Sequence, residues 1–264
     1  MRQRESSYSK KSWLKAKMAA AAVLNHYGID SVDEIQIRDI AYARGLRVQE
    51  IPIRGAEGRL VRRGRRGIAT VNKLIREPGK KRFVIAHELG HFEIHKEKPL
   101  FSCDEAAFLA WHRNRPEEVE ANVFAASILM PARLFQDAAS RKPIRVETIE
   151  ELASLFRVTL SAAAIRYATL DIEPCAVVFS QNGKVVWYRS SDSFPYEYIP
   201  LGQPVHPFSG AGEFFAKERF SKEPELTPYE VWFSDWSLES GKRCYEQCRL
   251  MPGYNAVLSL LFLP

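Results

Sequence analysis

The stretch Phe83-Val84-Ile85-Ala86-His87-Glu88-Leu89-Gly90-His91-Phe92-Glu93-Ile94-His95 combines a run of apolar residues with a His-Glu-x-x-His pattern. Residues four apart share one face of a helix, so His87 and His91 can place two imidazoles on one metal ion. Glu88 lies roughly 100° round the same helix, within reach of a water bound to that ion. Zinc peptidases use this local geometry. Because the five-residue pattern also arises by chance, the rest of the chain must support it.

A catalytic zinc site needs a third protein ligand and one open position. His95 is a poor choice, because it would lie about 12 Å from His87 along a straight helix. The helix predicted at residues 114–130 has acidic residues near its start. Relative to the centre of its apolar face, Glu118 lies about 50° away and Glu120 about 110° away. We therefore expect Glu118 to be the third ligand and Glu120 to point outward.

Asn122 is four residues beyond Glu118 on the same helix. This position allows its side chain to hydrogen-bond a metal ligand and to orient it. The alternative for Glu118 is an acidic first turn that stabilises the helix dipole. The alternative for His95 is a helix-end residue that the same dipole favours when the imidazole is charged.

The composition indicates a globular protein with a modest positive charge. The 264 residues are 46% hydrophobic and 27% charged, with a net charge of +6 and a pI near 9.1. This charge is compatible with an acidic or nucleic-acid partner without indicating one. No apolar run approaches the roughly 18 residues of a membrane helix. The apolar run Met18–Leu24 is short and crowded by lysines, which disfavours a signal peptide.

Four scattered cysteines do not form a disulfide framework, which favours a reducing compartment, and we expect a cytoplasmic location. Two of them, Cys244 and Cys248, are four apart but have no second pair or histidine nearby. We expect these two to be ordinary thiols rather than a metal site.

The pattern of helices and strands predicts an α+β fold. The elements expected up to residue 130 are helices at 12–27, 33–44, 80–96, 104–111 and 114–130, and strands at 46–53, 60–61 and 68–72. The last two strands form a hairpin whose tip, residues 62–67, contains four arginines. The tip is either a solvated turn or an electrostatic contact for an acidic substrate or nucleic acid.

Residues 146–170 predict two helices joined by a tight turn near residues 157–160, which is similar to a helix-turn-helix. Such pairs are more often packing units than DNA readers, and the second helix offers only Arg166 as a strong base contact. A hairpin around Asn182-Gly183 follows, and the chain closes on a strand-like run at 255–263. We place a domain boundary near residues 171–174, before an α/β or mainly-β module.

With these residues assembled, the chain resembles the ImmA/IrrE family of metallopeptidases. The first block of the resemblance is Val71-Asn72 followed by Arg82-Phe83-x-x-Ala86-His87-Glu88-Leu89-Gly90-His91-x-x-x-His95. The second block is Glu118-x-x-Ala121-Asn122-x-Phe124-Ala125-Ala126-x-x-Leu129-Met130-Pro131. The resemblance implies a zincin-like α+β core with a small antiparallel or mixed sheet, and cleavage of a helix-turn-helix repressor in stress response or mobile-element control. Some relatives carry a sensor-like domain at the C-terminal end.

These observations predict a zinc-dependent endopeptidase. We expect His87, His91 and Glu118 to hold Zn²⁺, and Glu88 to take a proton from the attacking water. In this fold type an edge strand pairs with the extended substrate, and Ile68–Asn72 is the expected strand, with Thr70, Val71 and Asn72 in contact. The expected domains are a metallopeptidase domain at 12–140, a helical segment at 141–172 and a C-terminal, sensor-like module at 173–264.

Three alternatives stay open. The first is a non-proteolytic regulator that binds a repressor or DNA and has a structural metal site, although such a site has no use for a base at Glu88. The second is a DNA-binding regulator acting through residues 146–170 and the arginine-rich tip. We expect a protein partner rather than direct binding of nucleic acid. The third is a metal-dependent hydrolase of a non-peptide substrate.

Overall fold

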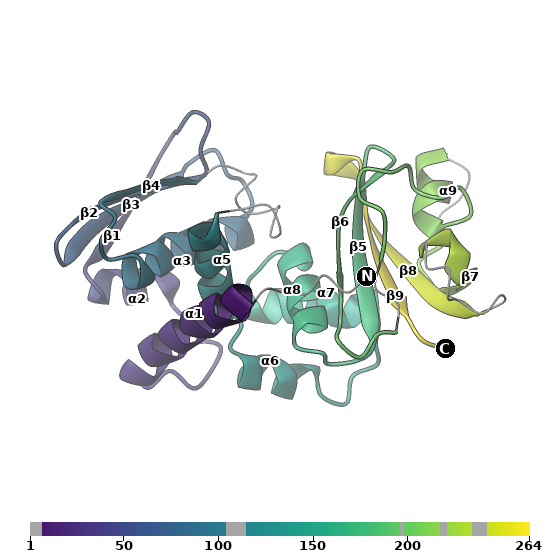
Figure 1. Cartoon of the computed structure of the whole chain (residues 1–264), viewed down its shortest axis with the longest axis horizontal. Helices are drawn as coiled ribbons and strands as arrows, with labels where there is room; N and C mark the ends of the chain where they lie inside the picture. Colours follow the sequence, from purple (N-terminus) through teal and green to yellow (C-terminus); the bar gives the residue numbers. More distant parts are fainter. Residues whose placement is uncertain (1–6, 104–114, 196–197, 217–220, 234–241) are drawn as a thin grey trace. The chain divides into compact units, whose positions relative to one another are not determined.

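The computed structural model describes residues 7–103, 115–195, 198–216, 221–233 and 242–264 (Figure 1). Their contacts form two compact units. The N-terminal unit holds the described residues up to Ala138 together with Ala153–Thr159, and the C-terminal unit holds Ala139–Leu152 and Leu160–Pro264. Each unit combines helices with a sheet that contains antiparallel strands, so the predicted α+β class is confirmed. The helix predicted at 104–111 lies outside the described residues, and the three predicted domains stay a prediction.

The N-terminal unit contains the predicted helices and strands with small changes at their ends. Its elements are α1 (Ser7–His26), α2 (Ile37–Ala43), β1 (Leu46–Ile51), β2 (Gly58–Arg63), β3 (Arg66–Asn72), α3 (Pro78–Ile94), β4 (Leu100–Cys103), α5 (Pro116–Leu129) and α6 (Ala132–Ala139). The four strands form a mixed sheet in the order β1-β3-β2-β4, in which only β1 and β3 are parallel. The β2–β3 hairpin turns at Gly64 and Arg65, so its strands extend into the segment predicted as a tip. Gly64 supplies the positive φ of 60° that this turn needs.

The prediction that Ile68–Asn72 is an edge strand is wrong, because β3 lies between β1 and β2. Thr70 and Val71 each have strand partners on both sides, and the N–H of Asn72 donates to the carbonyl of Glu57 at 2.8 Å. The Asn72 side chain bonds the backbone of the loop that follows β1. The backbone of these three residues is therefore not available for a substrate strand. Alternating hydrophobicity indicates a strand but does not show how many neighbours it has.

Helix α3 is the centre of the N-terminal unit. Every residue from Val84 to Phe92 is buried, because β2 and β3 cover one side of the helix and α5 covers another. The two helices cross closely at Gly90, where an added Cβ would lie 3.1 Å from Phe124 Cβ and 3.2 Å from the Cα of Ala121. An added Cβ would therefore press on α5, and the close crossing brings α5 over the histidines of α3.

The C-terminal unit is a five-stranded antiparallel sheet with helices packed against it (Figure 1). Its elements are α8 (Leu160–Thr169), β5 (Cys175–Gln181), β6 (Lys184–Ser190), α9 (Gly210–Ala216), β7 (Glu225–Pro228), β8 (Arg243–Met251) and β9 (Ala256–Phe262), while residues of α7 (Val146–Phe156) belong to both units. The strand order is β6-β5-β9-β8-β7. Asn182 and Gly183 have φ values of 50° and 75°, which confirms the predicted hairpin turn.

Two features of the C-terminal unit bear on the other predictions. Arg166, which the sequence offers as the strong base contact of the helix pair, is 5% exposed, so its side chain is not available to read a base. Cys244 and Cys248 lie on strand β8 and are buried free thiols, as is Cys175. Among the described helices, none is both long enough and apolar enough to span a membrane.

Candidate metal centre

Three side chains from α3 and α5 converge on one point. His87 Nε2 lies 3.0 Å from His91 Nε2 and 3.2 Å from Glu118 Oε2, and the His91–Glu118 distance is 3.5 Å. These residues are the group of potential metal ligands found within the described part of the chain. Tetrahedral ligands with bonds of about 2.1 Å to zinc lie about 3.4 Å apart, so the three atoms match one face of a zinc coordination shell. Sequence reasoning selected the same three residues.

The ring of His87 is oriented by Asn122. The two side chains meet through His87 Nδ1 and Asn122 Oδ1 at 2.9 Å in a buried contact. An amide oxygen accepts, so Nδ1 carries the proton and the lone pair of Nε2 faces His91 and Glu118. Asn122 is therefore where the sequence placed it, in contact with an expected ligand.

Phe101 supports the second histidine from strand β4. Its ring stacks on His91 with centroids 3.9 Å apart and an interplanar angle of 21°. Phe101 is itself 8% exposed, so the stack is shielded from water. The position was not singled out from the sequence, because nothing local shows that β4 folds onto the end of α3.

The protonation states of the cluster suit a cation. Burial lowers the pKa of His91 to about 3, so its imidazole is neutral at physiological pH. Burial raises the pKa of Glu118, but the close contacts of its carboxylate with the His87 and His91 rings outweigh this effect and bring the pKa well below the usual value. Neutral imidazole and ionised carboxylate are the forms that bind zinc.

Glu88 directly follows His87 in α3 and is fully buried. Its carboxylate rests against Gly58 of β2, where a Cβ would overlap Glu88 Oε1 and lie 2.9 Å from Val84 Cγ1. From the sequence, this strand is expected at residues 60–61 only, so Gly58 is not among the predicted site residues. A glycine inside a strand often marks a close approach of another group, and that signal could have identified it.

The prediction that Glu120 points outward is wrong. Glu120 is 7% exposed and hydrogen-bonds His95 Nε2 at 3.0 Å. Ser12 and Lys15 of α1 donate to the same carboxylate. The apolar face of α5 indicates only one buried side, whereas α1 also covers a second side of this helix. His95 does end α3, as expected, yet its side chain is 8% exposed rather than solvated.

Comparison with known proteins relates one segment of the chain to a family. Residues 41–167 match the family model of the IrrE N-terminal-like domain. A segment of 103 residues is 30% identical to the radiation response metalloprotease IrrE of Deinococcus radiodurans, covering 39% of this chain and 31% of that protein. The chain thus matches about a third of the length of this relative.

A solved structure supports the fold over most of the chain. A Mycobacterium tuberculosis transcriptional regulator superposes with a TM-score of 0.61 over 94% of this chain and 75% of that one. The sequence identity is 17%, so this likeness concerns the fold alone. The matched segment contains the His-Glu-x-x-His helix and the helix that carries Glu118. Residues 41–167, which include the His-Glu-x-x-His helix and Glu118, are thus similar to the IrrE N-terminal-like domain of the ImmA/IrrE metallopeptidases.

Proposed function

We propose that this protein is a zinc-dependent endopeptidase with a zincin-like core that cleaves a helix-turn-helix transcriptional repressor. The observation that carries the proposal is the triangle of His87, His91 and Glu118 ligand atoms beside the buried carboxylate of Glu88. A purely structural site needs no carboxylate held next to it, and structural zinc sites are closed by four protein ligands. Three ligands leave one position open.

The chemistry follows from the residues around that position. Zinc bound there supplies a Lewis acid that polarises the scissile carbonyl and activates a water at neutral pH. Glu88 accepts the proton of the attacking water and passes it to the leaving amine. Asn122 keeps the Nε2 of His87 available for the metal, and burial keeps His91 neutral.

Strand β4 is a better candidate for substrate pairing than β3. Among the described strands, β4 pairs only with β2, so its other edge has no strand partner there. Phe101 of β4 stacks on His91, which places this strand next to the metal centre. An extended peptide that adds to the free edge would therefore pass close to the reacting groups. This arrangement favours a peptide substrate over a small molecule.

The decisive experiment compares the Glu88→Gln variant with the wild-type protein. Both are loaded with zinc and incubated with a purified repressor encoded beside the gene, with and without a chelator. We expect the wild-type protein to cleave the repressor only with zinc, and the variant to bind zinc without cleaving. Glu97→Gln, at an exposed position, is the matched control and should retain cleavage. Cleavage by Glu88→Gln would contradict the mechanism, and zinc binding without wild-type cleavage would favour a non-proteolytic regulator.

The proposal includes a cytoplasmic location and a stress-response or mobile-element role. Cys175, Cys244 and Cys248 are free buried thiols, which suits a reducing compartment. The regulatory role rests on the family resemblance, as does a sensor-like role for residues 173–264. Truncation after residue 172 should then change the cleavage rate without loss of zinc.

A further inference from the structure

His95 and Glu120 extend the metal centre by a hydrogen-bonded chain that ends on His91. We propose that these two side chains are positioning residues, which hold the His91 imidazole in the tautomer and orientation that expose Nε2 to the metal. The inference rests on the proposed function, because it takes His91 as a ligand. It assigns roles to two residues for which the sequence predicted none at the site.

The first link joins the two imidazoles. His91 Nδ1 lies 3.1 Å from His95 Nδ1, and the ring centroids are 5.1 Å apart. If His91 Nε2 is the ligand atom, its Nδ1 must carry the proton. His91 therefore donates, and His95 Nδ1 accepts. The neutral imidazole of His95 must then carry its own proton on Nε2.

The second link joins His95 to Glu120. His95 Nε2 lies 3.0 Å from Glu120 Oε2, so its N–H donates to the carboxylate. Both N–H donors in the series His91–His95–Glu120 consequently meet an acceptor. One set of proton positions therefore satisfies the four ring nitrogens of the two histidines and both hydrogen bonds. Because both side chains are less than a tenth exposed, water competes poorly for these bonds.

The far end of the chain is anchored to another helix. Ser12 of α1 donates to Glu120 Oε1, and Lys15 Nζ lies 3.3 Å from Glu120 Oε2. Phe101 adds lateral support, with its ring centroid 3.9 Å from that of His91 and 5.5 Å from that of His95. A helix-end histidine needs none of these contacts. Their combination instead matches the partners that orient a metal-bound imidazole.

Two conservative variants separate the links. In His95→Asn the amide oxygen can occupy the place of Nδ1 and still accept from His91, while the bond to Glu120 is lost. In His95→Gln the amide can occupy the place of Nε2 and still donate to Glu120, while the acceptor for His91 is lost. The readouts are the zinc dissociation constant by chelator competition and the visible absorption spectrum of the cobalt-substituted full-length protein. The melting temperature of the metal-free protein reports on folding.

We expect His95→Gln to weaken zinc binding by about 10- to 100-fold, the usual effect of losing a partner of a metal-binding imidazole. We expect His95→Asn to weaken it less, and only His95→Gln to change the cobalt spectrum markedly. Glu117→Gln is the control, since Glu117 lies on α5 like Glu120 but pairs with the exposed Lys98. Equal zinc binding by both His95 variants and the wild type overturns the inference, as does a lower melting temperature with an unchanged dissociation constant. A wild-type protein that binds zinc but cleaves no repressor refutes the proposed function alone.

Discussion

The carboxylate of Glu88 lies directly against Gly58, which belongs to strand β2 across from helix α3. A Cβ at Gly58 would overlap Glu88 Oε1 and lie 3.1 Å from Glu88 Cδ. The strand backbone therefore forms one wall of the space that holds the proposed base. Glycine at this position permits the Glu88 carboxylate, next in the chain to the proposed ligand His87, to be buried without displacement.

Gly58→Ala should reduce peptidase activity while zinc stays bound. The added methyl group pushes the Glu88 carboxylate away, and a shift of about 1 Å in a reacting group can lower the rate by about 100-fold. The measurements are the steady-state rate of peptide cleavage and the amount of zinc bound per protein. Gly253→Ala is the control, since a Cβ there meets no heavy atom within 4 Å. A wild-type rate in Gly58→Ala would contradict the prediction that the added methyl group displaces the Glu88 carboxylate.

Asn122→Leu should weaken zinc binding without removing a ligand. The bond between Asn122 Oδ1 and His87 Nδ1 selects the tautomer with a free Nε2, and its loss allows the other tautomer. A 10- to 100-fold weaker affinity is the usual scale for such a partner. Asn122→Asp retains the acceptor and should bind nearly as well as the wild type. Equal affinities of the Leu and Asp variants would rule out an orienting role.

Removal of the metal should destabilise the N-terminal unit. The proposed ligands join α3 to α5, and binding to the folded state at 100 times the dissociation constant stabilises it by about 2.7 kcal/mol. Thermal unfolding with zinc and with a chelator should therefore give different midpoints. The difference should disappear in Glu118→Leu, which lacks one ligand. A zinc-dependent midpoint that persists in this variant would point to a site elsewhere.

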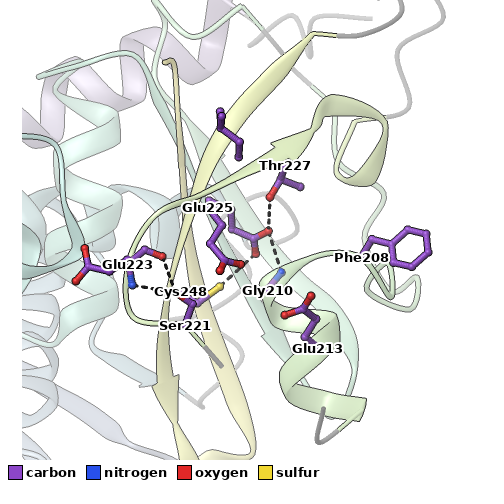
Figure 2. Close-up of a pocket in the computed structure, with 10 residues that line it drawn as sticks. Phe208, Gly210, Glu213, Ser221, Glu223, Glu225, Thr227 and Cys248 are labelled. Carbon is purple, nitrogen blue, oxygen red and sulfur yellow. Dashed lines mark hydrogen bonds between the residues drawn. The ribbon is translucent and has the colours of Figure 1, made fainter. Parts of the chain in front are cut away.

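Glu246→Leu should destabilise the C-terminal unit strongly. The Glu246 carboxylate is 3% exposed and accepts hydrogen bonds from Gly210 N–H, Trp232 Nε1 and Ser259 Oγ at 3.0–3.1 Å. Glu246 lines a pocket together with Gly210, Glu213 and Thr227, and Figure 2 draws the hydrogen bonds of Gly210 and Thr227 to its carboxylate as dashed lines. Each buried donor left without an acceptor costs about 1–3 kcal/mol, so the loss should exceed about 3 kcal/mol. Chemical denaturation measures it, and Glu213→Leu in the same pocket should cost less.

The buried thiols should resist alkylation in the folded protein. Burial raises the pKa of Cys244 to about 12 and raises those of Cys175 and Cys248 as well. Because the thiolate is the reactive form, raising the pH from 7 to 9 should not label them in the folded state. In unfolded protein all three should react as pH approaches 9. Mass spectrometry of a Cys103→Ser variant provides the count, and native labelling of Cys244 would contradict its burial.

The raised pKa of Cys244 also makes stability depend on pH. Above pH 9 the unfolded chain releases the thiol proton, while the folded protein retains it up to about pH 12. The folded state then binds more protons, so the free energy of unfolding falls as pH rises through this window, by at most about 1.4 kcal/mol per pH unit. Cys244→Ala should show a shallower decline than the wild type.

The sequence by itself determined the features that depend on local periodicity. The spacing of His87 and His91 on one helix face, and the inward direction of Glu118, follow from about 100° of rotation per residue. The turn at Asn182-Gly183 follows from the φ values that these residues tolerate. These features needed no knowledge of distant parts of the chain, and the structure contains them.

Only the tertiary structure decided which surfaces the local elements share. The interior position of β3 depends on pairing with β1, and strand pairing is not encoded in the alternation of a single strand. Helix α5 is buried at every residue from Glu120 to Leu129, because α1 and α3 both cover it. The apolar face of α5 shows only one of its buried sides. The polar contact of Glu120 with His95 lies on a different side of the helix, so the apolar pattern did not predict it. The approach of Gly58 to Glu88 likewise arises only when strand and helix pack together.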